Sequence, residues 1–416
     1  MSAPAPDTAV EPVPAAKVPP FAEFVALIAS LMALGALGID AMLPALPVVG
    51  RDLHVAVANH LQWIISIYFL GMGVGQLTFG VLSDWLGRKR VLLGGVFLYV
   101  ILALVAATTQ NFAALLIVRL LQGFAVSTSS VVTRSIIRDL YSGDRMAKVT
   151  SISVVVFLLV PILAPSFGQL VLSFAPWQAI FVSMAVFGAI SGTWAWLRLP
   201  ETHPAGKRRK PDLGHLKRVG FFVVTEPGSL FYTLAIAFLF GSLLAYVSLM
   251  PQIFTDVFHR PGLMATIFAC CAATMGGASI INASIVERFG SKRISHLALL
   301  GFIGVALVHF GWALAGRETV VSFVILQALT MGLMSLTTSN FGAIAMEKVG
   351  HVAGTASSLQ GVVSTIGAGA VSAAIGQGWN GGMWLLPLGA AVCGLIALAL
   401  VAVSEKGRIG WATARN

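Results

Sequence analysis

The stretch Gly80-Val-Leu-Ser-Asp84-Trp-Leu-Gly87-Arg88-Lys89-Arg90 decides the fold, because this short charged segment lies between two long apolar runs. A reduced copy, Val286-Glu-Arg-Phe-Gly290-Ser-Lys-Arg293, lies between two other apolar runs. Gly290 follows Gly87 by 203 positions, which is about half of the 416-residue chain. A charged hairpin that recurs once in each half predicts a duplicated helical bundle.

The composition indicates that lipid is the main solvent. Hydrophobic residues make up 57% of the chain and charged residues only 10%, whereas soluble domains carry about 25% charge. The formal net charge of +10 does not indicate nucleic-acid binding, because the basic residues are scattered over short loops. All three cysteines lie in apolar runs, and we interpret them as small core residues.

Twelve apolar runs are long enough to cross a bilayer, which takes about 20 residues. They are 21–47, 59–82, 91–109, 112–133, 148–172, 177–197, 228–252, 262–285, 294–314, 319–342, 352–376 and 382–403. A backbone in lipid must satisfy its own hydrogen bonds, so we predict helices for all of them. The expected fold class is an all-α membrane protein whose twelve transmembrane helices form two pseudo-symmetric six-helix bundles.

The expected organisation follows from these runs. Residues 1–20 are rich in Pro and Ala and are predicted to be a disordered tail. Two bundles, 21–197 and 228–403, are joined by a linker at 198–227 and followed by a tail at 404–416. The basic run Lys207-Arg-Arg-Lys210 could bind anionic lipid or nucleic acid, or it could be part of a solvated linker. Its place at the centre of the chain favours the solvated linker.

Two further pairs of segments support the duplication. Leu121-Gln122 recurs as Leu326-Gln327, and Phe167-Gly168-Gln169 recurs as Ile375-Gly376-Gln377. Their spacings are close to that of the two charged hairpins, and the order of the spans matches.

The positions of Lys and Arg predict the orientation. All but four of the 26 basic residues fall in segments on the same side as both termini; the exceptions are Arg51, Arg119, Arg260 and Arg317. Cytoplasmic loops of membrane proteins carry such an excess of positive charge, so both termini are expected in the cytoplasm.

Only Asp40 and Arg119 are charges well within the predicted spans. A charge at the centre of a bilayer costs about 2.5–3.5 kcal/mol on insertion scales, which makes both residues functional candidates. In one interpretation Asp40 reaches the outer water while Arg119 bonds neighbouring carbonyl groups. In the other interpretation they face one cavity and share a proton-sensitive network. Burial raises the pKa of a carboxyl group and a nearby arginine lowers it, so such a group can bind and release a proton.

The charged hairpin resembles the signature of the major facilitator transporters, Gly-x-Leu-(Ala/Ser)-Asp-(Arg)-x-Gly-Arg-(Arg/Lys). The resemblance implies a gating role for Gly80, Asp84, Gly87, Arg88, Lys89 and Arg90. Trp85 departs from the usual Arg. The resemblance also implies that Asp84 docks near Gly354-Thr355, at the N-terminus of the eleventh span, when the molecule is closed inside, because unpaired amides there favour an anion. The alternative is a loop that only fixes the orientation in the membrane. It accounts for the basic residues but not for Asp84.

The segment Ile39-Asp40-Ala-Met42-Leu-Pro-Ala-Leu-Pro47 is similar to the first-span signature of the Bcr/CflA drug-resistance branch. Met42 replaces the usual Tyr, and Arg119-Leu-Leu-Gln122-Gly123 matches an Arg-x-x-Gln-Gly motif linked to proton coupling in the wider family. The resemblance therefore implies that Asp40 and Arg119 couple proton movement to transport.

The fifth span carries Pro161-Ile-Leu-Ala164-Pro165-Ser-Phe-Gly168-Gln169. Each Pro removes a backbone donor and bends the helix. The run resembles the antiporter motif of drug exporters, although Pro161 and Gln169 replace glycines at its ends. The resemblance implies that this bend seals the cavity, whereas the alternative is a tolerated kink.

Six residues are predicted to line a cavity for an amphiphilic compound: Gln62, Tyr68, Gln122, Phe157, Phe240 and Tyr246. Packing or lipid contact is the alternative for each aromatic residue. No metal cluster, phosphate-binding loop or nucleophile–base set is found, so we expect neither an enzyme nor a cofactor other than the proton gradient.

The resemblance implies a proton-coupled multidrug antiporter that exports chloramphenicol-, sulfonamide- or bicyclomycin-like compounds by alternating access. An exporter of an endogenous amino acid or sugar is the alternative, and a sensor or scaffold would need no intramembrane charges. We expect a multi-pass monomer of the inner (plasma) membrane that handles a small molecule and protons and binds no nucleic acid.

Overall fold

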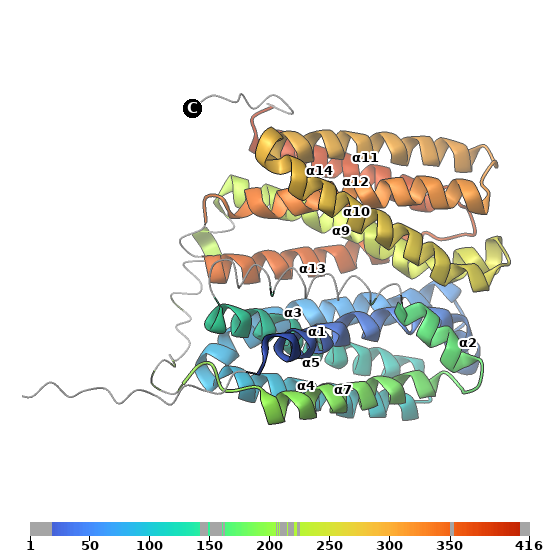
Figure 1. Cartoon of the computed structure of the whole chain (residues 1–416). Helices are drawn as coiled ribbons and strands as arrows, with labels where there is room; N and C mark the ends of the chain where they lie inside the picture. The colour runs from blue at the N-terminus through green and yellow to red at the C-terminus, as the bar shows by residue number, and fades with distance from the viewer. Residues whose placement is uncertain are drawn as a thin grey trace, which may run out of the picture.

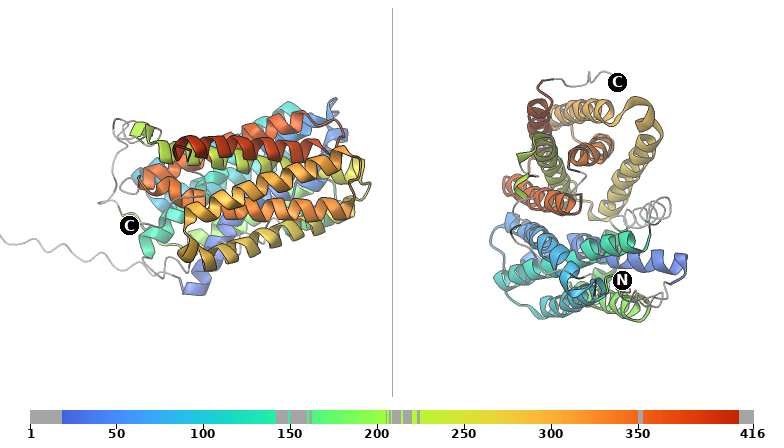
Figure 2. Two further views of the ribbon diagram at one scale, coloured as in Figure 1. Left: turned by 90° about the horizontal axis from the view of Figure 1, so that it is seen from above. Right: turned by 90° about the vertical axis from the view of Figure 1, so that its left-hand side faces the viewer.

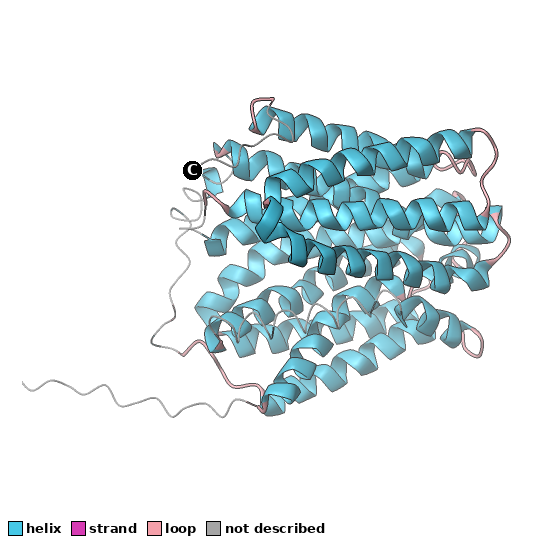
Figure 3. Cartoon of the chain, turned by 45° about the horizontal axis from the view of Figure 1, so that its top comes forward, coloured by secondary structure: helices cyan, strands magenta, loops and turns pink. Residues whose placement is uncertain are grey.

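The computed structural model describes residues 19–141, 149, 160, 163–204, 206, 208, 214, 220–222, 225–349 and 353–407. Every regular element among these residues is helical (Figures 1 and 3). The long helices are α1 (Phe21–Asp40), α3 (Trp63–Leu86), α4 (Arg88–Thr108), α5 (Phe112–Leu140), α7 (Gln178–Arg198), α9 (Pro227–Gln252), α10 (Met264–Phe289), α11 (Ser291–Leu314), α12 (Val320–Met346), α13 (Ala353–Gln377) and α14 (Leu385–Ser404). The all-helical fold class is confirmed.

Eleven helical stretches in the described part of the chain are long and apolar enough to span a membrane. They match eleven of the twelve predicted spans. The fifth predicted span, 148–172, lies partly outside the described residues, and its described end, Leu163–Leu172, is an apolar helix. The molecule is a multi-pass membrane protein.

The helices form two layers that lie side by side (Figure 1). Helices α1 to α7 make up the lower layer in that view, and α9 to α14 make up the upper one. Figure 2 shows the same division when the molecule is viewed along the helices. Helices α3 and α13 meet where the layers touch, since a side chain added at Gly73 would press on Ile366 and Gln76 Nε2 donates to Thr365 Oγ1 at 3.2 Å.

Backbone geometry repeats between the two halves. Gly87 separates α3 from α4 at φ 102° and ψ 148°, and Gly290 separates α10 from α11 at φ 78° and ψ 147°. Only glycine adopts this region without strain, so each charged hairpin turns on its glycine. We call the end of the molecule that carries both turns the glycine-turn end.

The first predicted span is one membrane-spanning stretch, Phe21–Asp52, but its α-helix is interrupted. Helix α1 stops at Asp40, and a short 3-10 helix, η1 (Leu43–Ala45), leads into α2 (Leu46–Asp52). Pro44 and Pro47 cause the break, because each lacks the amide hydrogen that a continuing helix needs and each lies at the start of its short helix. Helix α2 lies at the right in Figure 1.

Glycines bring α3 and α5 into backbone contact. A Cβ atom added at Gly71 would overlap the carbonyl of Leu120, and one added at Gly123 would overlap the carbonyl of Tyr68. Small residues allow membrane helices to approach in this way. The close packing holds Arg119, on α5, against α3.

Candidate functional site

Arg119 is the centre of a buried polar cluster in the first half. Its side chain is fully buried, Nη2 donates to the carbonyl of Gly38 at 2.8 Å, and Nε donates to the carbonyl of Ile64 at 3.3 Å. Nη1 donates to Oε1 of Gln122 at 2.8 Å. The guanidinium thus links α1, α3 and α5, and its charge is dispersed over neutral acceptors.

Two aromatic rings add to this cluster. The guanidinium carbon lies 4.2 Å from the ring centre of Tyr68 and 5.9 Å from that of Phe181. A cation over an aromatic face is attracted by the ring quadrupole, and the attraction grows when water is excluded. The Tyr68 hydroxyl contacts α1, where it donates to the carbonyl of Gly35 at 3.4 Å.

Asp40 lies two residues beyond the Gly38 carbonyl that Arg119 binds, at the end of α1. It is 6% exposed, so the interpretation in which it reaches outer water does not describe this structure. Its carboxyl group makes no hydrogen bond or ion pair within the described part of the chain, including with Arg119. Isolating a carboxylate from water and from partners is costly. Asp40 and Arg119 therefore share one short segment of α1 without touching.

The proline-containing segment of the fifth predicted span packs beside Asp40. A Cβ atom added at Gly168 would overlap the carbonyl of Ala41, and Ala164 is buried. Pro165 lies in the helix Leu163–Leu172, whereas Pro161 lies outside the described residues. The Ala164–Gly168 face therefore closes over the break in the first span.

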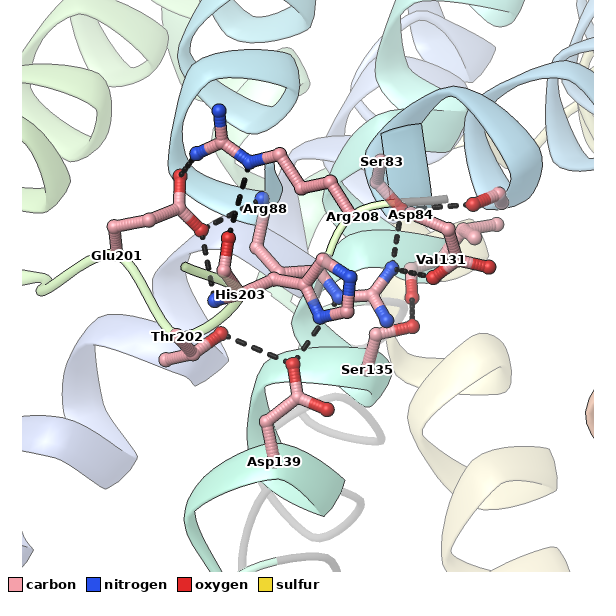
Figure 4. Close-up of polar contacts among 11 residues, drawn as sticks. Ser83, Asp84, Arg88, Val131, Ser135, Asp139, Glu201, Thr202, His203 and Arg208 are labelled. Carbon is pink, nitrogen blue, oxygen red and sulfur yellow. Dashed lines mark hydrogen bonds and ion pairs between the residues drawn. The ribbon is translucent and has the colours of Figure 1, made fainter. Parts of the chain in front are cut away.

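Arg88 anchors the charged hairpin in a network drawn in Figure 4. Its side chain is 4% exposed, with Nε 3.1 Å from Oδ2 of Asp139, and Nη1 2.6 Å from Oγ of Ser83 and 2.5 Å from Oδ1 of Asp84. Thr202 also donates to Asp139, at 3.1 Å. The network ties the start of α4 to the end of α5 and to the segment after α7.

Glu201 completes this network at Gly87. Its Oε1 accepts from the backbone N–H of Arg88 at 2.9 Å and from that of His203 at 3.0 Å. The second half has a related contact, because Glu405, 204 positions later, binds Lys292 Nζ at 2.8 Å at the start of α11. In each half, an acidic residue that follows the last helix thus contacts the start of the third membrane-spanning helix, α4 or α11.

Asp84 pairs with Arg88 in this structure, and its side chain is 57% exposed. Residues 350–352 and the side chains of 353–355 lie outside the described part of the chain, so the expected contact with Gly354-Thr355 stays a prediction. Lys89 is partly exposed and Arg90 exposed, on the first turn of α4. Gly80 packs toward Ser358 on α13, with 3.7 Å between a built Cβ atom and the hydroxyl.

The two halves are joined at the end opposite the glycine turns, which we call the Asn59 end. Asn59 Nδ2 donates to the carbonyls of Gln377 at 3.1 Å and Trp379 at 2.7 Å, and Gln377 Nε2 donates to the Asn59 carbonyl at 2.9 Å. Gln62 Nε2 donates to Gln252 Oε1 at 2.8 Å. These bonds hold the halves together at this end.

The residues predicted to line the substrate cavity occupy three places. Gln62 lies in the junction at the Asn59 end, and Tyr68 and Gln122 belong to the Arg119 cluster. Phe240 packs across the halves on Phe69, with ring centres 6.2 Å apart. Tyr246 is buried in the second half with its ring 5.3 Å from that of Phe268, and Phe157 lies outside the described residues.

The sequence reasoning missed Asp139, Glu201 and Tyr99 as functional partners. Asp139 belongs to a run, Arg138 to Tyr141, whose acid beside a base at a helix end was a usable signal. Glu201 was detectable only through its spacing from Glu405. Tyr99 is fully buried and points its hydroxyl toward the carbonyl of Leu34 at 3.4 Å, a contact that no sequence pattern indicates.

Comparison with known proteins is consistent with this architecture. The family model "Major Facilitator Superfamily" matches residues 28–372. The chain is 29% identical to a "Bicyclomycin resistance protein homolog" of Haemophilus influenzae over 82% of this chain and 85% of that one. It is 28% identical to a "Chloramphenicol resistance protein" of Pseudomonas aeruginosa over 88% of each. The solved structure of the human organic anion transporter MFSD10 (TETRAN) superposes with a TM-score of 0.62 at 20% identity, covering 92% of this chain and all of that one. The chain belongs to the major facilitator superfamily and is a membrane transporter rather than an enzyme.

Proposed function

We propose that the protein is a proton-coupled multidrug exporter of the plasma membrane that works by alternating access. The resistance proteins to which the chain is similar support a drug as substrate. Chloramphenicol-, sulfonamide- and bicyclomycin-like compounds are the substrate classes we propose. Both termini and the glycine-turn end face the cytoplasm, in agreement with the distribution of Lys and Arg.

The observation that carries this proposal is the pairing of a fully bonded buried Arg119 with an unbonded buried Asp40. Arg119 holds the carbonyl of Gly38, so any movement of the guanidinium moves the backbone two residues from Asp40. A proton or a cationic group neutralises Asp40. When that proton or cation leaves, the carboxylate is charged and must be hydrated or paired with Arg119. Proton binding and the position of α1 are thereby linked.

Alternating access requires two junctions that break in turn. The Asn59 end is joined in this structure, and in the orientation proposed above this corresponds to closure toward the outside. The charged hairpin forms the opposite gate. In the proposed cycle Asp84 exchanges its partner Arg88 for the N-terminus of α13 when the cytoplasmic side closes.

A resistance profile tests the proposal. We expect an efflux-deficient host that expresses the wild type to show raised inhibitory concentrations for at least one of the three compound classes. Asp40→Asn and Arg119→Ala, produced at equal levels, are expected to return the host to the empty-vector value. Asp256→Asn changes an exposed acid outside both clusters and should behave as the wild type. Full resistance with Asp40→Asn would count against proton coupling through this residue, and no resistance to any class would favour an endogenous metabolite.

A further inference from the structure

The second half contains a buried pair of titratable side chains that the proposed coupling site does not use. His309 lies near the end of α11, and Glu318 lies in the turn before α12, at the Asn59 end. Their side chains are 1% and 4% exposed, and Nε2 of His309 lies 3.5 Å from Oε2 of Glu318. Neither of these two atoms has a hydrogen-bond partner in the described part of the chain.

The carboxyl group of Glu318 has one partner of its own. Oε1 accepts from Oγ of Ser322 at 3.0 Å, and Thr319 caps the N-terminus of α12 through Ser322. Its other oxygen, Oε2, faces His309. A neutral His309 can donate one hydrogen bond to a carboxylate but leaves the buried charge uncompensated, whereas one added proton turns the contact into an ion pair with a charge-assisted hydrogen bond.

The nearest titratable residues in the sequence are exposed. Asp256, His259 and Arg260 follow α9, and Arg317 precedes Glu318; all four are exposed. Helix α12 carries no titratable residue, and α14 carries only Cys393. Neither helix therefore offers the pair a further carboxyl, imidazole or amine group.

Aromatic contacts connect this pair to the junction between the halves. The ring of His309 lies 5.8 Å from that of Phe323, and Phe323 lies 5.8 Å from both Phe254 and Phe258. Phe254 also lines a cavity of about 320 Å³, together with Pro44 and Leu172 of the first half. A change in how His309 packs is thus transmitted to a wall shared by both halves.

The backbone that carries Phe254 is suited to rearrangement. Pro251 lies in the last turn of α9. Phe254 belongs to a π-helical turn, η4 (Ile253–Val257), which begins directly after α9 ends at Gln252. Such turns are rare, occur often at functional sites and contain one residue more than the regular helix accommodates. The junction contact of Gln252 with Gln62 lies immediately before this turn.

We propose that His309 and Glu318 form a proton-binding site in the second half and that its protonation stabilises closure at the Asn59 end. Protonation closes the 3.5 Å gap and firms the packing of Phe323 on Phe254. Opening of this end admits water, which can hydrate the deprotonated pair. The inference rests on the proposed function only for its role in transport, since the site and its effect on closure are independent of any drug.

Spin labels across the junction test the inference without substrate. Arg51→Cys and Asp256→Cys place labels on exposed positions of the two halves, in a background without the three native cysteines. Asp40→Asn is added to remove the first-half carboxyl group. Between pH 8.5 and pH 5.5 we expect the ratio of short to long distances to rise by on the order of tenfold, the factor that corresponds to about 1.4 kcal/mol.

Adding His309→Asn, or separately Glu318→Gln, is expected to abolish this response, while His259→Asn, an exposed control, leaves it intact. Because the two variants remove the site by different substitutions, misfolding of one still leaves the other as a test. A response that survives in the folded variants, or its absence in the Asp40→Asn background, overturns the inference. Absence of drug transport by the wild type, with the pH response of the labelled protein intact, would overturn the proposed function instead.

Discussion

The two glycine turns provide a matched pair of substitutions. Gly87 and Gly290 have closely similar backbone angles, with φ of 102° and 78°. An alanine at either site pays the strain of a conformation that L-residues rarely adopt, about 1–3 kcal/mol. The surroundings differ, since a Cβ atom at Gly290 meets nothing within 4 Å, whereas one at Gly87 lies 2.5 Å from Oε2 of Glu201 and 2.7 Å from Nη2 of Arg208. The same two side-chain atoms lie 3.8 Å apart as an ion pair.

The additional cost at Gly87 follows from what Glu201 does. Its carboxylate accepts hydrogen bonds from the backbone N–H groups of Arg88 and His203, and displacement breaks or weakens both. Hydrogen bonds to charged groups contribute about 1.5–3 kcal/mol each, and the displaced carboxylate regains some hydration. We therefore expect Gly87→Ala to cost about 2 kcal/mol more than Gly290→Ala.

The assay is the free energy of unfolding, measured by titration with a denaturing detergent in mixed micelles. The double variant Gly87→Ala/Glu201→Ala completes a mutant cycle and should remove most of the excess cost, because the side chain of Arg208 then loses its partner Glu201 and can move away from Gly87. Equal costs for Gly87→Ala and Gly290→Ala, or an excess that persists without Glu201, would refute the assignment of Glu201 as the residue that fixes the hairpin.

Three further expectations follow from other contacts. Asn59→Ala removes three hydrogen bonds that join the halves, so spin labels at positions 51 and 256 should report about 5–150-fold more of the separated state. Val57→Ala, at an exposed neighbour, should report no change. Gly123→Ala forces a methyl group onto the Tyr68 carbonyl and should cost about 1–3 kcal/mol or more in unfolding titrations, while Gly94→Ala, in open space on α4, should stabilise by about 0.5–1 kcal/mol. Burial raises the pKa of the Glu405 carboxyl, but hydrogen bonds from Lys292 and Tyr232 outweigh it and leave the pKa lowered. The ionised Glu405 therefore stabilises the fold fully above pH 4.5, and this stabilisation is lost as the pH falls through the lowered native pKa. Glu405→Gln should make the free energy of unfolding depend less on pH in this acid range.

The sequence predicted those features that depend on composition and local pattern. Span positions follow from runs of apolar residues, and the glycine turns follow from one repeated segment, so both halves could be foreseen. The break after Asp40 was encoded in Pro44 and Pro47, but the apolar run through them concealed it. A hydropathy pattern shows which segments are apolar more readily than it shows where a helix ends.

Contacts between distant segments could not be predicted. Arg119 and Asp40 were recognised as buried charges, yet the bond from Arg119 to the Gly38 carbonyl depends on the register of α1 against α5. Likewise, Glu318 looks like an ordinary loop acid until the turn after α11 brings it beside His309.

The central claim is that drug movement is coupled to protons through Asp40. The most direct measurement is the internal pH of proteoliposomes, followed with a trapped fluorescent dye after a drug that raises resistance in the host is added. The account predicts drug-dependent proton movement with the wild type and none with Asp40→Asn, although the variant still folds and binds the drug. Equal proton movement in both proteins, or drug transport by the wild type without any, would contradict it.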